Sequence, residues 1–342
     1  MINFRYHIVS LIAVFLALAI GVIMGSAVID RAIVNRLEDQ QHSLENRIND
    51  VEAENDALTA ENDDLRQSAE ALAEEGSERL LNGALAEVPI LVVATRGIDD
   101  ESFDALSSLL DRSGADRRGT LFLTDRFTLD DDSEIDDMGT ALDVATRSPD
   151  SLRSLALTRL SAQLREAIGD TAPDDPAVET TTTILDPAAE PVPTSLPVVD
   201  ALRESSFLDF VPPDGEPDDA GPQLPLATRI VFVSGVGSDV PVADVAEPLA
   251  ALLAAERTGL PEIGLLAAED LPDTDDPFTE FVVALREDDV VNDRLSTVDN
   301  LGDFAGRLAA VLAIADLSGD QRGHYGEGPG RQRLLPAPLE SG

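Results

Sequence analysis

The sequence predicts an α/β protein that is held at a membrane by one N-terminal transmembrane helix and a parallel coiled coil. Three patterns lead to this fold class: an uncharged apolar stretch over residues 8–29, a leucine heptad repeat over 30–75, and alternating strand and helix patterns over 88–316. Such alternation is typical of a mainly parallel sheet, here of roughly five strands, with flanking helices. Residues 1–7 are expected to form a short cytoplasmic tail, and residues 317–342 a flexible tail.

The apolar stretch from Ile8 to Ile29 is long enough to cross a bilayer. About 20 helical residues, each rising ~1.5 Å, span a hydrocarbon core of about 30 Å. A cleaved signal peptide is the alternative, with Gly25, Ser26 and Ala27 as a small-residue cleavage site. The apolar part of a signal peptide is usually only about 7–15 residues long, however. We therefore expect an uncleaved anchor in the cell membrane, with the C-terminal domain outside the cytoplasm.

Small side chains recur at every fourth position of this stretch, at Ala13, Ala17, Gly21 and Gly25. These positions share one face of a helix. Small residues let two helices approach closely in lipid, where packing drives their association. The pattern favours a helix–helix contact within the membrane, and its alternative is chance, because Gly and Ala are common in such segments.

A heptad repeat follows the apolar stretch and ends at Gly76. Asn55 and Asn62 would be buried polar residues, which favour a parallel two-stranded register, and Arg47 can meet Glu52 of a second copy. The predicted core consists of Val34, Leu37, Leu44, Ile48, Val51, Asn55, Leu58, Asn62, Leu65 and Leu72. The alternative is a single amphipathic helix folded back on its own domain. Strict sevenfold spacing favours the supercoil, and hence a homodimer.

The composition is strongly acidic, with a formal net charge of −42 and a chain without cysteine. All 24 basic residues are arginine. Such a surface repels nucleic acid, so we expect no nucleic-acid partner. The absence of cysteine excludes disulfides, thiol nucleophiles and thiolate metal sites. The acidity itself is interpreted as a solubility feature of a salt-adapted protein.

Strand and helix patterns alternate after residue 87. Strands are expected at 88–94, 119–124, 230–234, 262–267 and 295–298, each a short apolar run. Helices are expected from Asp99 onward and at 138–148, 151–168, 242–257, 278–288 and 300–316. The Pro- and Asp-rich composition of residues 169–225 indicates a long polar insertion, of which only residues 206–211 are apolar enough to dock on the core.

The sequence offers few candidate catalytic motifs. The loop Ser234–Asp239 follows a predicted strand and has two of the three glycines of a dinucleotide fingerprint. We interpret it as a tight turn, with nucleotide binding as the alternative. Of the histidines His7, His42 and His324, only His324 lies beyond the predicted coil. No catalytic or cofactor-binding residue is singled out, and we do not expect an enzyme.

Three segments resemble one known family. Residues Phe4–Gly25, Ser296–Asn300 and Gly323–Gly326 are similar to its opening signature and to two later motifs. The family is the actinobacterial copper transporter group of MctB-like (mycobacterial copper transport protein B) proteins. The resemblance covers most of the chain in order, apart from the insertion.

The resemblance implies an envelope protein with a role in copper export or tolerance. Copper is implied only in this way, because copper(I) prefers Cys and Met ligands and the chain has no cysteine and only three methionines. His324 is the single motif residue with metal-ligand chemistry, and a hydrogen-bonded or solvated histidine is its alternative. The other function to weigh is a non-enzymatic dimeric scaffold or regulator of cell-envelope or peptidoglycan assembly, which would contact envelope proteins through the coil and the α/β domain.

Overall fold

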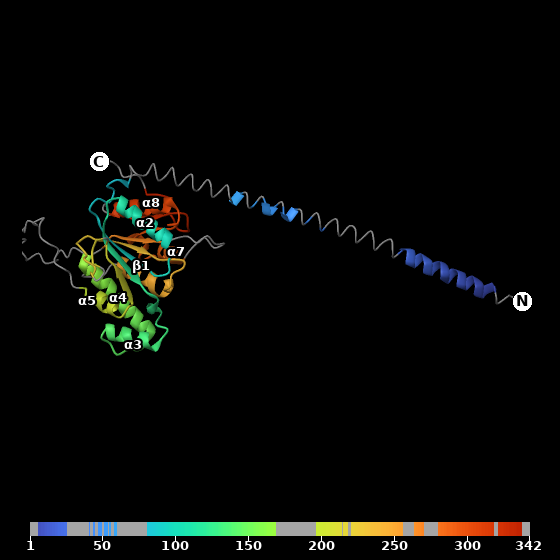
Figure 1. Ribbon diagram of the computed structural model, residues 1–342, viewed down its shortest axis with the longest axis horizontal. Helices are drawn as coiled ribbons and strands as arrows, with labels where there is room; N and C mark the ends of the chain where they lie inside the picture. The colour runs from blue at the N-terminus through green and yellow to red at the C-terminus, as the bar shows by residue number, and fades with distance from the viewer. Residues whose placement is uncertain are drawn as a thin grey trace, which may run out of the picture. The chain divides into compact units, whose positions relative to one another are not determined.

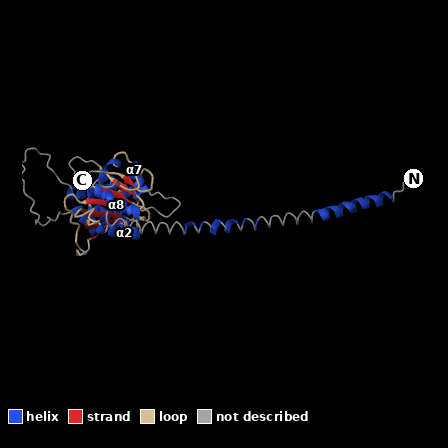
Figure 2. Cartoon of the chain, turned by 90° about the horizontal axis from the view of Figure 1, so that it is seen from above, coloured by secondary structure: helices blue, strands red, loops and turns tan. Residues whose placement is uncertain are grey.

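The computed structural model describes residues 6–25, scattered positions between 41 and 59, and most of the chain from residue 81 onward. In this last part it describes residues 81–168, 196–213, 215–217, 220–255, 263–269, 280–317 and 321–336. The chain divides into two compact units, Met1–Ala69 and Glu70–Gly342. Figures 1 and 2 show both units.

The first unit contains one apolar helix, Tyr6–Gly25, whose side chains are not covered by other parts of the chain. Among the described residues it is the one helix long and apolar enough to cross a membrane. Described positions between 41 and 59 are also helical. Four predicted core residues there, Leu44, Ile48, Val51 and Leu58, are 56–63% exposed. Pairing of two such helices stays a prediction, and Val34, Leu37, Asn62, Leu65 and Leu72 lie outside the described residues.

The second unit is built on a mostly parallel sheet, as the sequence predicts. The described residues form seven strands in the order β3-β2-β1-β4-β5-β6-β7, and only β3 runs antiparallel to its neighbour. The strands are β1 (Pro89–Thr95), β2 (Asp116–Leu123), β3 (Leu208–Val211), β4 (Arg229–Val233), β5 (Leu265–Ala268), β6 (Ser296–Val298) and β7 (His324–Tyr325).

Helices cover both faces of this sheet (Figure 1). One face carries α2 (Asp100–Arg112) and α8 (Phe304–Asp316). The other carries α3 (Asp132–Ala141), α4 (Pro149–Ile168), α5 (Pro197–Glu204), α6 (Glu247–Ala254) and α7 (Glu280–Glu287). Short turns of helix, η1 (Asp125–Thr128), η2 (Val242–Ala246) and η3 (Asn292–Arg294), join these elements.

The continuous apolar runs of the sequence explain the two-sided core. Along β1, Ile90 and Val92 point into the cluster that contains α2 and α8, whereas Leu91 and Val93 point into the other cluster. Successive side chains of a strand alternate between its faces, so a strand covered on both sides must be apolar throughout.

The described part of the polar insertion carries regular secondary structure, which adds to the prediction for residues 169–225. It contains α5, which the sequence did not predict, and the antiparallel strand β3, which lies within the apolar piece 206–211 expected to dock. In β3 the buried residues Leu208 and Phe210 alternate with the exposed residues Asp209 and Val211. This is the period of a strand with one covered face, and β3 forms an edge of the sheet.

The prediction of a flexible tail at 317–342 is wrong for residues 321–336. Strand β7 extends the sheet beside β6, and His324 and Tyr325 are buried.

Three predicted helices begin at other residues than the sequence predicted. The helix expected at 138–148 is α3, which begins at Asp132; the one expected at 242 is α-helical only from Glu247; and α8 begins at Phe304 rather than at 300. Asn300 lies in a turn with φ 58°, which a right-handed helix does not allow.

Candidate functional site

The first candidate for a functional site in the α/β unit is the point where the strand order reverses. The loops after β1 and β4 meet there, at the carboxyl ends of neighbouring parallel strands. Gly97 and Gly237 have φ values of 87° and 82°, and a Cβ on Gly97 would lie 2.3 Å from the carbonyl oxygen of Gly237. The two loops are therefore packed backbone to backbone, and Ser234–Asp239 is a tight turn.

Little space remains between these loops. The cavity there measures about 10 Å³ and is lined by residues that include Ser102, Val233 and Ser234. Small-molecule pockets measure roughly 300–1,000 Å³. The N-terminus of α2 is also occupied, because the Asp99 carboxylate accepts a hydrogen bond from the Ser102 backbone N–H at 2.8 Å. That bond lowers the pKa of Asp99. An anionic phosphate is disfavoured beside this carboxylate.

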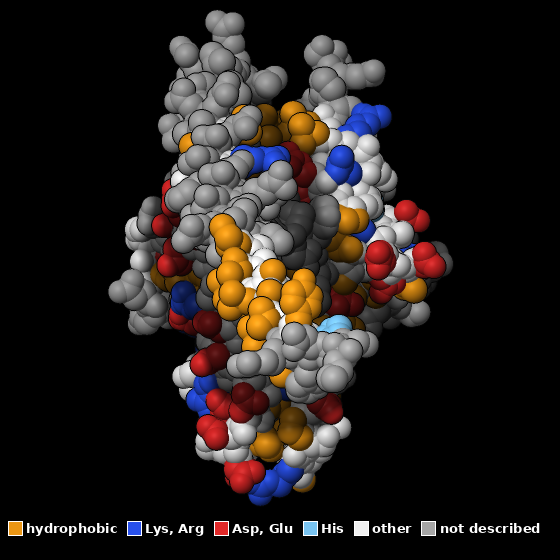
Figure 3. Space-filling model, turned by 90° about the vertical axis from the view of Figure 1, so that its right-hand side faces the viewer, with side chains coloured by type: hydrophobic (Ala, Val, Ile, Leu, Met, Phe, Trp, Pro, Cys, Tyr) orange, Lys and Arg blue, Asp and Glu red, His pale blue; other side chains and the backbone are white. Residues whose placement is uncertain are grey.

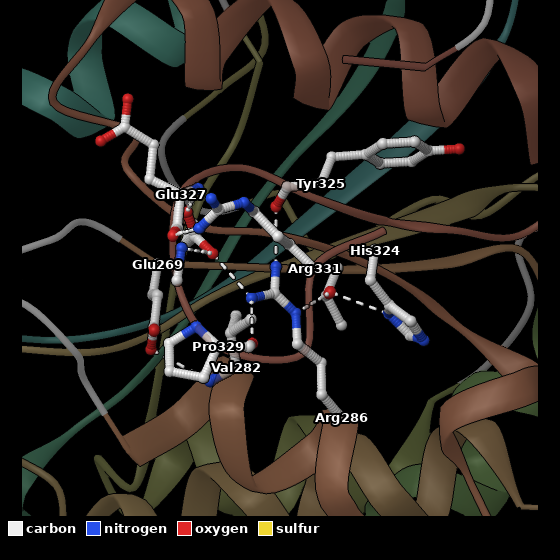
Figure 4. A network of polar contacts seen from close by, with 11 residues as sticks. Glu269, Val282, Arg286, His324, Tyr325, Glu327, Pro329 and Arg331 are labelled. Carbon is white, nitrogen blue, oxygen red and sulfur yellow. Dashed lines mark hydrogen bonds and ion pairs between the residues drawn. The ribbon is translucent and has the colours of Figure 1, made fainter. Parts of the chain in front are cut away.

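The second place is the junction of β6, β7 and α7, where two of the sequence motifs meet (Figure 4). Thr297 pairs with His324 and Val298 pairs with Tyr325 across the parallel strands. The motif Ser296–Asn300 therefore lies beside the motif Gly323–Gly326, although more than twenty residues separate them in sequence. Most of the polar side chains in this junction are buried.

Arg286 on α7 connects the two motifs. Its Nε donates to Thr297 Oγ1 at 2.8 Å, and its Nη1 donates to Asp299 Oδ2 at 2.7 Å and to the Pro329 carbonyl oxygen at 2.9 Å. Its Nη2 donates to the Tyr325 carbonyl oxygen at 2.7 Å. Burial lowers the pKa of Arg286, and the nearby carboxylate of Asp299 opposes that effect. The guanidinium stays charged, since an arginine pKa starts so high.

Asp299 completes the junction from the end of β6. Its Oδ1 accepts from the Glu327 backbone N–H at 2.5 Å, and its Oδ2 accepts from the Gly328 N–H at 3.0 Å. The side chains of Asp299 and Arg286 are each 1% exposed. A Cβ on Gly326 would lie 2.0 Å from Asp299 Oδ1, so this close approach requires glycine. The carboxylate thus holds two successive backbone N–H groups and one guanidinium.

His324, the metal candidate from the sequence, lies at the edge of this network. It is 8% exposed, and its Nδ1 is 3.0 Å from Thr297 Oγ1. Burial lowers the pKa of His324, the guanidinium of Arg286 lowers it further, and Asp293 acts in the opposite direction. The imidazole is therefore neutral at neutral pH. A buried guanidinium nearby disfavours a cation at this residue.

The junction is suited to fastening the C-terminal segment to the sheet. Every nitrogen of the Arg286 guanidinium and both oxygens of Asp299 have partners in the network. Within the described residues, no group of three or more His, Cys, Asp or Glu side chains is placed to hold a metal ion. Acidic side chains are spread over the visible surface in Figure 3. Met138 is fully buried in the core.

The remaining sequence-predicted residues lie in the first unit. Ala13, Ala17, Gly21 and Gly25 are on helix Tyr6–Gly25, and a Cβ on either glycine would meet nothing within 4 Å. Asn55 is helical and exposed.

Sequence reasoning missed Arg286 and Asp299 as functional residues. Asp299 belongs to a quoted motif, but no role was assigned to it. A signal for Arg286 existed: it follows Val282 by four residues, which places a charge on the apolar face of α7. A charged residue at a core-facing position predicts a buried ion pair, although it does not name the partner.

Comparison with known proteins gives the family. Residues 1–336 match the family model described as copper transport outer membrane protein, MctB. The chain belongs to the MctB family. The proteins named copper transporter MctB from Mycobacterium bovis and Mycobacterium tuberculosis are each 29% identical to it over 346 residues, covering 96% of this chain and 98% of theirs. The protein of the same name from Mycobacterium leprae is 26% identical over 336 residues.

The match confirms the family resemblance seen in the sequence motifs. It spans the N-terminal apolar helix, the heptad segment and the α/β unit. MctB-family membership therefore applies to the chain as a whole, including the C-terminal segment that reaches the junction of β6 and β7.

Proposed function

We propose that this MctB-family chain is a single-pass envelope protein whose α/β domain lies outside the cytoplasm and serves copper export or tolerance. The observation that carries the proposal is the family match over residues 1–336, which includes the apolar helix Tyr6–Gly25. A helix of this length and composition supplies a membrane anchor. One such helix cannot enclose a pore, so the chain would act as a component of an assembly, with copper as its cargo.

A copper-challenge experiment tests this function. Deletion of the gene is expected to lower the copper concentration that the cells tolerate, and the full-length chain is expected to restore it. A chain that lacks residues 6–25 is the matched control and should fail to restore tolerance if anchoring is required. Unchanged tolerance in the deletion strain would contradict a copper role.

Direct copper handling is a separate question, which calorimetry of the full-length chain in detergent answers. Titrations with Cu(I) and Cu(II), beside the variant His324→Ala, separate a site at this histidine from other sites. His324 is the metal candidate from the sequence, and the guanidinium of Arg286 lowers its pKa. We expect weak binding or none at His324, so equal heats for both chains are the expected outcome.

A second function has support from two observations. The four described apolar residues of the heptad core are more than half exposed on a helix, and the loops at the strand-order reversal leave a cavity of only about 10 Å³. Both favour a non-enzymatic dimeric scaffold that regulates cell-envelope or peptidoglycan assembly through its coil and α/β domain. The deletion strain would then show a cell-separation or envelope defect that copper does not change.

A further inference from the structure

The C-terminal segment 321–336, called the strap below, is joined to the α/β unit mainly by polar contacts. Its strand β7 has only two residues. Tyr325 and Leu335 join the apolar cluster beside α8, whereas Arg331, Gln332 and Arg333 are exposed. The strap folds back on itself, because the Gln332 N–H donates to the His324 carbonyl oxygen at 2.8 Å. A segment held in this way can detach without dismantling the core.

The surface that receives the strap is made by α7 and β6. Arg286 donates to two strap carbonyl oxygens, those of Tyr325 and Pro329. Asp299 accepts the N–H groups of Glu327 and Gly328. The strap therefore both donates hydrogen bonds to the surface made by α7 and β6 and accepts hydrogen bonds from it, around one buried ion pair. A shift of the strap relative to that surface would break several of these bonds together.

His324 is the titratable group of the strap that lies inside this contact. Thr297 Oγ1 accepts from Arg286 Nε at 2.8 Å and lies 3.0 Å from His324 Nδ1. A neutral imidazole fits this chain of contacts, because the Thr297 hydroxyl can donate its hydrogen to Nδ1. A protonated imidazole would instead place a second positive charge one hydroxyl group away from the guanidinium.

The charges around His324 come from several elements. Burial lowers its pKa and Arg286 on α7 adds to this effect, whereas Asp293 on η3 raises the pKa. Asp299 at the end of β6 is engaged with Arg286, and the neighbouring strap residues Arg322 and Arg333 are cationic. Burial and the Arg286 guanidinium outweigh the opposing effect of Asp293 and favour the neutral imidazole. A proton on His324 therefore weakens the docked state of the strap.

We propose that residues 321–336 form a releasable strap, which closes on α7 and β6 while His324 is neutral and opens when its imidazole takes up a proton. Opening uncovers the buried pair Arg286–Asp299 and the edge of β6. By linkage, an imidazole whose pKa is lower in the docked strap than in the open strap makes opening more favourable once it is protonated. This opening of the strap does not depend on the copper role proposed for the chain.

The composition of the chain supplies a specific reporter for this opening. The sequence has no tryptophan and two tyrosines, Tyr6 and Tyr325. In a full-length Tyr6→Phe chain in detergent, tyrosine fluorescence comes from Tyr325 alone, which is 7% exposed in the closed strap. Acrylamide quenching is measured between a pH of about 8 and about 5.5, the window in which an imidazole titrates. We expect the quenching constant to rise several-fold towards the acidic end.

Two further variants in the same Tyr6→Phe background decide the cause. His324→Asn keeps a hydrogen-bond acceptor near Thr297 but cannot titrate, so its quenching should stay low throughout. Arg286→Ala should raise quenching at every pH. Quenching that does not depend on pH, an equal rise in His324→Asn, or protection that persists in Arg286→Ala would overturn the proposal. A loss of far-UV circular dichroism with the same midpoint would also overturn it, because it would mean global unfolding.

Discussion

Arg286 is the residue on which the C-terminal half of the sheet depends most. Its guanidinium joins α7, β6 and the strap through four hydrogen bonds, and its side chain is 1% exposed. Removing one partner of a buried ion pair leaves the other charge without compensation. The contribution of this residue is therefore far larger than that of an ion pair at the surface.

We expect Arg286→Ala to lower the free energy of unfolding by about 3–5 kcal/mol, because the Asp299 carboxylate is left buried without its cation. Urea denaturation of the full-length chain in detergent measures this loss. The matched control is Arg117→Ala, which removes a pair with Asp111 of 2.6 Å whose side chains are 21% and 49% exposed. Its cost should be under about 1 kcal/mol. Equal losses for the two variants would contradict the assignment.

Gly328 tests the close packing of the strap on the same pair. A Cβ there would lie 2.8 Å from Asp299 Oδ2 and 3.5 Å from Arg286 Nη1. We expect Gly328→Ala to destabilise the chain by about 1–3 kcal/mol through overpacking. At Gly221 the added Cβ would meet only a flexible Arg203 side-chain nitrogen at 3.4 Å. Thermal unfolding should show little change for Gly221→Ala, and a similar change in both variants would contradict this packing.

Helix α3 illustrates the element scale, where the sequence prediction was displaced by several residues. The helix begins at Asp132 because Asp131 and Glu134 form a capping box. Glu134 accepts the backbone N–H of Asp130 at 3.0 Å and that of Asp131 at 3.4 Å. The sequence prediction placed the helix start at residue 138, although Asp at the N-cap with Glu three residues on is a helix-start signal.

Loss of this cap should be measurable. We expect Glu134→Ala to lower the free energy of unfolding by about 0.5–1 kcal/mol, since two backbone N–H groups lose their acceptor. Glu134→Gln keeps an acceptor oxygen and should retain most of the stability. Hydrogen exchange at the first turn of α3 localises the effect. Equal protection in all three chains would show that the cap does not stabilise this helix.

At the scale of the whole molecule, the predicted homodimer depends on the heptad positions. Asn55 occupies a core position of the predicted seam, and Asn49 lies on the outer face of the same helix. In a parallel coiled coil a buried Asn specifies register and the two-stranded state at a cost in stability. These two residues therefore offer the same substitution inside and outside the predicted seam.

We expect Asn55→Leu to raise the thermal stability of the coil and to broaden the distribution of oligomeric states beyond the dimer. Asn49→Leu is the matched control and should leave that distribution unchanged. Sedimentation velocity of the full-length chains in detergent measures both. A monomer at all concentrations, or the same change in both variants, would contradict the parallel coil.

The sequence by itself determined the features that follow from local pattern. The apolar stretch after Ile8, the continuous apolar runs of β1 and β4, and the alternation of strand and helix required only hydrophobic period and length. The family motifs were also visible in the sequence, although their purpose was not. Each of these signals is carried by neighbouring residues, and this is why it could be found without the fold.

Only the tertiary structure showed that the C-terminal segment is docked on the sheet and what its motif residues contact. The Gly- and Pro-rich composition after residue 317 indicates a flexible end, yet the strap is docked by Arg286 and Asp299. These contacts join residues far apart in the chain, and polar bonds of this kind leave no periodic signal. Glycine in the strap is required by close approach to a carboxylate, and the carboxylate could be identified only once the chain had folded.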